Sequence, residues 1–141
     1  MTRSVHCDIV SADESLFSGS VDMVIATGSL GEMGITPGHA PLLSDLNPGP
    51  VRLVREGGEE EIYYLSGGYI EVQPNSISIL ADSAVRAADI DEAAAAEAVK
   101  SAEQTIANMS AEIDYSKAAT MLAEASAQLR TVQTLRKKLG N

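Results

Sequence analysis

Aromatic residues are scarce in this chain, whose 141 residues include one phenylalanine, four tyrosines and no tryptophan. A hydrophobic core therefore has to be built mainly from Val, Ile, Leu and Met. The single cysteine, Cys7, excludes an intramolecular disulfide and a cysteine-based metal cluster. Because Cys7 stands in an apolar strand pattern, we expect a buried, unreactive thiol in a reducing compartment.

Long apolar runs are missing as well. No segment approaches the length of a membrane span, and the first residues do not resemble a signal peptide. Positive charge is also scarce, since 10 basic residues stand against 20 acidic ones and the formal net charge is −10. Nucleic acid is not expected as a partner, because a duplex binder needs Lys and Arg to neutralise phosphates. We expect a soluble protein that reaches a membrane only through a partner.

The few basic residues are unevenly placed. Residues 1–129 contain 6 basic and 20 acidic side chains, whereas the remaining stretch contains four basic residues and no acid. These four are Arg130, Arg136, Lys137 and Lys138. They either complement the dipole of a terminal helix or dock against an acidic protein surface, and the sequence leaves both interpretations open.

Residues 4 to about 86 have the pattern of short β-strands. Apolar and polar residues alternate over 5–9 and over 21–25, so we expect Met23 and Ile25 to face the core with Val21. Further strands are predicted at 51–53, 62–65, 69–72 and 76–80. Short strands with closely spaced turns are typical of a β-sandwich or a barrel.

The composition changes near Ala87, because from there to residue 127 the chain is rich in alanine and contains no glycine or proline. Asp89 followed by Glu92 resembles a capping box, which predicts the start of a helix. Apolar residues then recur at helical spacing, at Ala95, Val99, Ala102, Ile106 and Met109. Polar residues over 108–114 predict a turn, after which Ser110 or Asp114 is expected to cap a second helix.

The second helix has one apolar heptad stripe and is expected to end at Gly140. The stripe consists of Tyr115, Ala118, Leu122, Ala125, Leu129, Val132 and Leu139. Two such helices joined by a short turn predict an antiparallel hairpin. Because its seam is mostly alanine, the hairpin is expected to be weakly held and able to open; a permanent cap on the sandwich is the alternative. The predicted fold class is α+β, with a β-sandwich domain at 1–87 and a two-helix domain at 88–141.

The sequence contains no convincing active site. His6 and His39 are far apart, and His39 with nearby Glu32 offers too few ligands for a metal site. No Ser or Cys stands in a nucleophile motif, and the glycine-rich segment 28–34 lacks the Gly-Lys-Ser/Thr ending of a phosphate loop. We predict no catalytic residue, no cofactor and no metal. The alternative is a small β-barrel metal enzyme that uses Glu32 and His39.

Several stretches together resemble one family. In chain order they are residues 10–12, 16–19, 27–29, 31–35, 37–43, 65–68, 71–72, 79–82, 114–115 and 127–130. Their order and spacing resemble the epsilon subunit of bacterial F-type ATP synthase over nearly the whole chain. The resemblance implies a ten-stranded β-sandwich followed by a two-helix hairpin. It also implies a non-catalytic role in the central stalk, at the cytoplasmic face of the bacterial inner membrane.

The resemblance further implies partners and contacts. The sandwich would join the gamma subunit to the c-subunit ring and couple proton-driven rotation to ATP synthesis, with Glu32 and His39 as candidate ring contacts. The hairpin would extend into the head of alpha and beta subunits and inhibit hydrolysis. Its basic residues, Arg130, Arg136, Lys137 and Lys138, are the candidate inhibitory contacts. In isolation, the chain is expected to be a monomer.

Some members of that family bind ATP through the motif Ile/Leu-Asp-x-x-Arg-Ala. The corresponding segment here contains Ile90 and Asp91, but Ala94 stands in place of the arginine. Alanine offers phosphate neither charge nor hydrogen-bond donors. Lys100 supplies some charge one or two turns later, and we expect no useful ATP site. A free-standing adaptor whose hairpin binds one partner is the remaining alternative.

Overall fold

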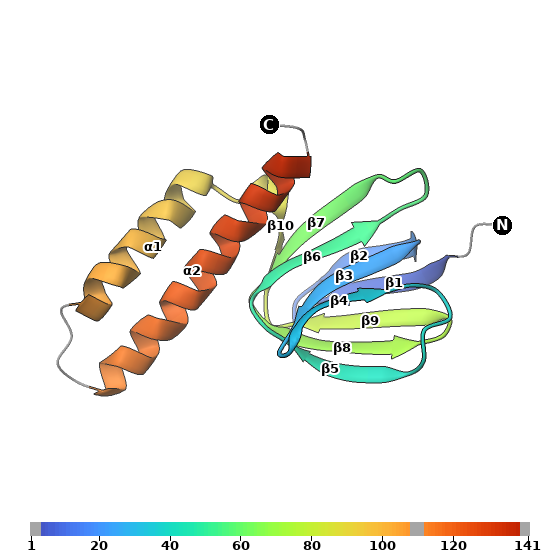
Figure 1. Cartoon of the computed structure of the whole chain (residues 1–141), viewed down its shortest axis with the longest axis horizontal. Helices are drawn as coiled ribbons and strands as arrows, with labels where there is room; N and C mark the ends of the chain where they lie inside the picture. Colours follow the sequence, from blue (N-terminus) through green and yellow to red (C-terminus); the bar gives the residue numbers. More distant parts are fainter. Residues whose placement is uncertain (1–3, 108–111, 139–141) are drawn as a thin grey trace.

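The computed structural model describes residues 4–107 and 112–138, which form a β-sandwich and a helical hairpin (Figure 1). The strands are β1 (Val5–Val10), β2 (Ser15–Val21), β3 (Met23–Gly28), β4 (Gly31–Ile35), β5 (Leu42–Leu46), β6 (Gly49–Val54), β7 (Glu60–Leu65), β8 (Gly68–Gln73), β9 (Ser76–Ala81) and β10 (Ala84–Arg86). A 3₁₀ turn (Ala87–Asp89) leads into α1 (Glu92–Ala107), and α2 (Glu112–Lys138) follows. The predicted α+β class and the hairpin are confirmed.

The ten strands form one hydrogen-bonded sheet that folds into two layers. One layer has the order β10-β7-β6-β3 with β4 paired to β3, and the other has the order β5-β8-β9-β1-β2. A single residue pair, Gly28 with Leu46, joins β3 to β5 where the sheet passes between the layers. β1 and β9 are parallel, and the other pairs are antiparallel.

The core lies between these two layers and is built from aliphatic residues with one tyrosine. Its largest fully buried members are Tyr63, Ile9, Ile35, Leu53, Leu65, Ile70, Ile77 and Ile79. Cys7 is also fully buried, as the alternation predicted. Burial, with a smaller contribution from the charge of Asp8, raises the pKa of the Cys7 thiol to about 12. The thiol is therefore protonated at neutral pH and unreactive.

The register of β3 differs from the predicted alternation. Val24 and Ala26 are fully buried in the core, whereas Met23 and Ile25 are half-buried on the opposite face. β2 ends at Val21, and the backbone N–H of the intervening Asp22 donates to Val54 O across 2.7 Å. This break shifts the alternation by one residue, which moves every side chain to the other face. The prediction that Met23 and Ile25 face the core is wrong.

The start of α1 also differs from the prediction. Asp89 lies in the 3₁₀ turn, and Ile90 has extended backbone angles, φ −81° and ψ 129°. The helix begins at Glu92, and Asp91 Oδ1 accepts a hydrogen bond of 3.1 Å from the N–H of Ala94. Asp91, not Asp89, is therefore the capping residue, because the extended residue at 90 delays the helix.

The hairpin packs through one seam, and α2 lies between α1 and the sandwich (Figure 1). The seam residues that are buried are Ala95, Ala102, Ala118, Ala125 and Val132. Val99, Ile106, Leu122 and Leu129 are half-buried. α2 begins at Glu112, so Asp114 lies inside the helix and does not cap it. Met109, Ser110, Leu139 and Gly140, like the side chain of Tyr115, lie outside the described residues.

Candidate functional site

The two candidate ring contacts, Glu32 and His39, lie toward opposite ends of β4. Glu32 is exposed and pairs with Thr27 beside the tip of the β3–β4 hairpin. His39 lies beyond the other end of the strand, where its N–H donates to Thr36 O at 3.2 Å and its Nδ1 donates to Ala40 O at 2.7 Å. The strand residues between Glu32 and Ile35 alone span roughly 10 Å. The two side chains therefore do not form one site.

The β3–β4 hairpin presents an apolar side chain at its tip. Leu30 is fully exposed, and Gly31 next to it has φ +128°, a conformation that favours glycine. Asn47 braces the turn from the neighbouring connection, because its N–H donates to Thr27 O at 3.0 Å and its Nδ2 donates to Gly28 O at 3.4 Å. Leu30 was not among the residues predicted from the sequence, although an apolar residue between Ser29 and Gly31, both turn-forming residues, is a signal for an exposed apolar tip.

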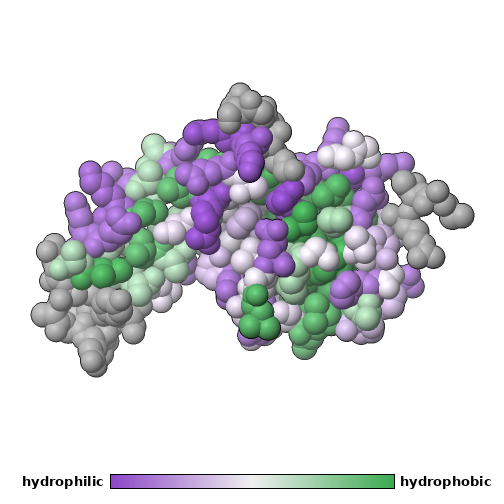
Figure 2. All heavy atoms as spheres, viewed as in Figure 1, coloured by the Kyte–Doolittle hydropathy of each residue, from purple (hydrophilic) through white to green (hydrophobic). Residues whose placement is uncertain are grey.

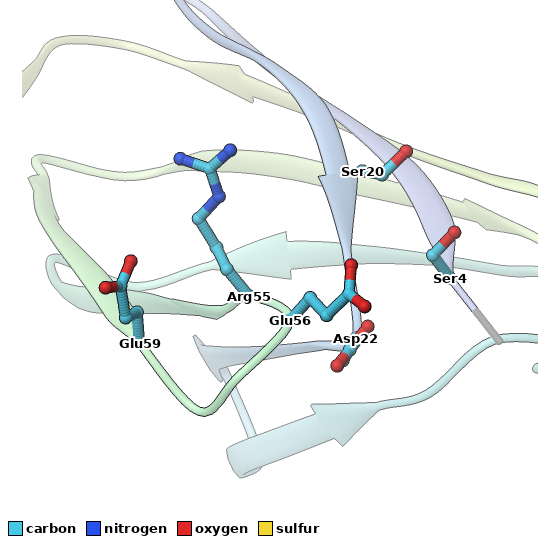
Figure 3. A pocket seen from close by; sticks show the side chains of 6 residues that line it. All are labelled: Ser4, Ser20, Asp22, Arg55, Glu56 and Glu59. Atoms are coloured by element: carbon cyan, nitrogen blue, oxygen red, sulfur yellow. The ribbon is translucent and has the colours of Figure 1, made fainter. Parts of the chain in front are cut away.

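The surface hollows do not resemble an active site. The hollow shown in Figure 3 has a volume of about 500 Å³ and is lined by Ser4, Ser20, Asp22, Arg55, Glu56 and Glu59. Arg55 is already engaged, 3.5 Å from Glu61 and 5.8 Å above the Phe17 ring. A second hollow next to His39 is lined only by Ser4, Pro37, Gly38, Pro74 and Asn75. Within residues 4–107 and 112–138, no group of three His, Cys, Asp or Glu side chains could hold a metal ion.

α2 is buried on a second side that the heptad stripe did not predict. Ala127 and Thr131 have zero exposure and lie one turn apart, and the Thr131 hydroxyl donates to Ala127 O at 2.7 Å. α2 packs on β6 and β7. In β7, Tyr63 and Leu65 belong to the core, whereas Ile62 and Tyr64 are buried on the other face of the strand.

Tyr64 marks the contact between β7 and α2. The side chains of α2 that act on its hydroxyl are Glu124, Gln128 and Arg130. Burial, followed by the negative charge of Glu124, raises the pKa of Tyr64 to about 12. Small and polar residues therefore make up much of this interface. Such an interface gains less from the hydrophobic effect than a contact between large apolar side chains.

A sequence signal for this contact existed. All four residues from Ile62 to Leu65 are buried, and a strand covered on both faces has a continuous apolar run instead of an alternating one. The partner residues on α2 gave no comparable signal, because Ala127 and Thr131 are as common on exposed helix faces as at close contacts.

The basic residues near the end of α2 differ in their contacts. Arg136 forms an ion pair with Glu92, which joins the last turn of α2 to the first turn of α1. Arg130 is exposed but close enough to Tyr64 to influence its titration. Lys137 is exposed, and the side chain of Lys138 lies outside the described part of the chain.

The guanidinium of Arg136 lies beside the segment that corresponds to the ATP motif, but it is already paired with Glu92 of that segment. The Asp91 carboxylate caps α1, Ile90 is half-buried in the linker and the Ala94 side chain is exposed. Arg86, the nearest preceding arginine, lies 3.3 Å from Glu61 and 5.4 Å above the Tyr63 ring. Its guanidinium is therefore held against β7.

The outer face of the second layer carries an exposed apolar patch formed by Leu43, Tyr69 and Leu80. Their exposed fractions are 70%, 54% and 59%. Tyr69 lies directly opposite Leu80 on β9, and Leu43 lies opposite Glu71 on β8. The view in Figure 2 shows hydrophobic surface both on the hairpin and over the sandwich. Adjacent exposed apolar residues on one sheet face are typical of an interaction surface.

Comparison with known families agrees with this architecture. A model of the ATP synthase delta/epsilon chain β-sandwich domain matches residues 4–87, and a model of the delta/epsilon chain long α-helix domain matches residues 88–133. The chain belongs to the ATP synthase delta/epsilon chain family. Family membership makes it a component of the ATP synthase stalk, in which other subunits perform catalysis.

Two solved structures have the same fold. A chain of the Euglena gracilis mitochondrial ATP synthase (OSCP/F1/c-ring in rotational state 1) is 23% identical with a TM-score of 0.77, and the match covers 96% of this chain and 81% of that one. A chain of the Tetrahymena thermophila mitochondrial ATP synthase central stalk/c-ring is 12% identical with a TM-score of 0.63. That match covers 93% of this chain and 98% of the other. Among the described residues, no helix of this family member is long and apolar enough to cross a membrane.

Proposed function

We propose that this chain is the epsilon-type subunit of the central stalk of a proton-translocating ATP synthase. Its sandwich couples rotation of the ring to the gamma subunit, and its hairpin restrains ATP hydrolysis. The observation that carries the proposal is the ordered match of both delta/epsilon domains over residues 4–133. The bacterial inner membrane and the domain boundary at 87/88 are part of the same proposal.

The apolar patch of Leu43, Tyr69 and Leu80 is our candidate for the gamma contact. The outer face of the other layer is partly occupied by α2, so this face is the one free to bind a large partner. Two acidic residues, Asp45 and Glu71, lie opposite Tyr69 and Leu43 in the pairing of β5 with β8. A matching surface on gamma would be apolar with basic residues at its rim.

The ring contact lies at an end of the sandwich. Glu32, together with the exposed Leu30, offers a charged and an apolar group at one end, whereas His39 lies toward the other end. A ring that meets one end of the sandwich would contact only one of the two candidates. The single substitutions Glu32→Ala and His39→Ala distinguish the two candidates. Only the substitution of a residue that contacts the ring should reduce the amount of c subunit recovered with the chain.

The hairpin acts as the brake through its basic end. In the arrangement described here Arg136 is paired with Glu92, whereas Lys137 is exposed. Opening the hairpin frees Arg136 and carries the basic cluster away from the sandwich. An exposed ion pair contributes only about 0–1 kcal/mol, so inhibition should depend on the cluster as a whole. Arg130, Arg136, Lys137 and Lys138 would dock on an acidic surface of a beta subunit in the head.

Affinity purification from membranes tests the stalk assignment. A tagged chain should recover gamma, c and beta subunits, identified by mass spectrometry. Leu80→Asp should abolish recovery of gamma, whereas the matched control Met121→Asp, at an apolar hairpin residue of 56% exposure, should retain it. Recovery of a soluble partner without ring or catalytic subunits would support the free-standing adaptor instead.

Membrane ATPase activity tests the brake. Deletion from Arg130 onward should raise hydrolysis clearly, and replacement of Arg136, Lys137 and Lys138 together by Ala should raise it partly. ATP synthesis should persist in both variants, because the sandwich still connects gamma to the ring. Unchanged hydrolysis in fully assembled complexes would show that the helices are not the brake.

A further inference from the structure

We propose that the ion pair between Arg136 and Glu92 is a latch that holds the hairpin closed and, while closed, withholds Arg136 from the catalytic head. The inference rests on the proposed function of the hairpin as a brake. The two residues are 44 positions apart, yet the guanidinium of Arg136 contacts the carboxylate of Glu92 directly. The latch therefore ties the end of α2 to the start of α1, next to the linker from the sandwich.

The position of α1 makes this contact important. α1 packs against α2, and its buried side chains are Ala95 and Ala102. A methyl group buries little apolar area, and of the larger seam residues only Val132 is buried, whereas Val99, Ile106, Leu122 and Leu129 stay half-buried. The seam therefore resists separation less than a seam of fully buried large side chains would. Under these conditions a single additional contact at the open end of the hairpin shifts the balance between closed and open forms measurably.

The latch is also reversible. The side chains of Arg136 and Glu92 are 54% and 31% exposed, so water competes for both charges. An exposed pair of this kind changes the ratio of closed to open forms by up to about five-fold. This range suits a contact that must release without global unfolding.

Arg136 has two mutually exclusive partners in this scheme. It binds Glu92 when the hairpin is closed, and it binds the acidic surface of the head when the hairpin is extended. Substitutions at the two ends of the latch therefore act in opposite directions on inhibition. Glu92→Gln opens the latch and leaves Arg136 available, whereas Arg136→Gln opens the latch and removes a docking cation.

A double-mutant cycle in the isolated full-length chain tests the latch itself. Spin labels on Glu97→Cys in α1 and Gln133→Cys in α2 report the fraction of open hairpins by pulsed distance measurement. Both positions are exposed, and the buried Cys7 remains unlabelled. E92Q and R136Q should each increase the open-to-closed ratio by up to about five-fold, and the double variant E92Q/R136Q should increase it no further.

K137Q is the matched control, because Lys137 is the next residue, is exposed and forms no ion pair within the described residues. It removes the same charge and should leave the ratio unchanged. Additive effects of E92Q and R136Q, or an effect of K137Q equal to that of R136Q, would overturn the latch.

ATPase measurements on membranes with the assembled enzyme test the second half of the proposal. E92Q should lower hydrolysis and R136Q should raise it. If both variants shift hydrolysis in the same direction, Arg136 does not exchange between the two partners. The distance cycle does not involve the synthase, so failure of the brake and failure of the latch are distinguishable.

Discussion

The packing of α2 on the sandwich makes a specific prediction for Ala127→Leu. Ala127 has zero exposure, and its neighbour one turn on, Thr131, is equally buried. An isobutyl group in place of the methyl group has no space there unless α2 moves away from β6 and β7. Overpacking of this kind typically costs about 1–3 kcal/mol. Because the sandwich has its own core, Ala127→Leu should weaken the docking of α2 and leave the stability of the sandwich unchanged.

The expected result is a docked-to-undocked ratio lowered by about five-fold to more than a hundred-fold. Tyr64 provides the assay, because burial and the charge of Glu124 on α2 raise the pKa of its hydroxyl to about 12, and undocking of α2 should remove both causes. In Ala127→Leu the pKa of Tyr64 should fall toward the ordinary value of 10.0. Absorbance titration of tyrosinate, with Tyr64→Phe subtracted as the reference, measures this shift.

Ala123→Leu is the matched control, since Ala123 lies one turn earlier on the same helix and is exposed. It should leave the titration of Tyr64 unchanged. If Tyr64 has the same pKa in Ala127→Leu as in Ala123→Leu, then close approach of small residues does not hold α2 to the sandwich.

Four further predictions concern Tyr64, Gly68, the segment around Ala94 and the independence of the sandwich. Docking of α2 raises the pKa of Tyr64, so docking is fully supported below pH 10 and weakens as the pH rises toward 12. The protection of β7 amides, after correction for the intrinsic base-catalysed exchange rate, should fall over this window, and Tyr64→Phe should remove that fall. Gly68→Ala should lower the free energy of unfolding by about 2 kcal/mol or more, because Gly68 has φ +144° and a Cβ there would lie 2.0 Å from Leu80 O. The control Gly34→Ala should be neutral, because a Cβ at position 34 meets nothing within 4 Å. Thermal or chemical unfolding measures both variants. Calorimetric titration with ATP should give no saturable signal in the micromolar range, and Ala94→Arg should be the variant that gains one. Removal of residues 88–141 should leave a cooperatively melting sandwich with dispersed NMR signals, and a non-cooperative melt would show that both parts share one core.

Period-two alternation predicted strands correctly where one face of the strand is buried in the core, whereas β4, β5 and β10 were not among the predicted ranges. The residues around Cys7 illustrate this, since Val5, Cys7 and Ile9 are all buried and His6 is exposed. The alternation failed at Met23 because one additional residue between the two strands, Asp22, reverses the inward face. A pattern within one strand carries no information about such a break in the neighbouring connection.

The helical half shows a different limit. The heptad stripe predicted the seam, where Ala118, Ala125 and Val132 are buried. The stripe did not predict the second buried side of α2. Small residues such as Ala127 and Thr131 become fully buried wherever the fold brings another surface close, and a helical sequence pattern does not indicate where that happens. Glu32 and His39 are close in sequence, but most of β4 lies between them, and the sequence pattern did not indicate that strand.

The contrast between the two halves supports the proposal that one chain combines coupling with regulation. The sandwich core contains large aliphatic side chains with almost no exposure, and such close packing makes a rigid body. The hairpin seam consists of alanine methyls, Val132 and larger side chains that are only half-buried. The hairpin is also held by a small and polar contact at Ala127 and Tyr64 and by the exposed ion pair of Arg136. Each of these contacts is weak, and none extends into the core. The helices can therefore leave the sandwich without loosening it, which is the property that a brake mounted on a rotating coupling element requires.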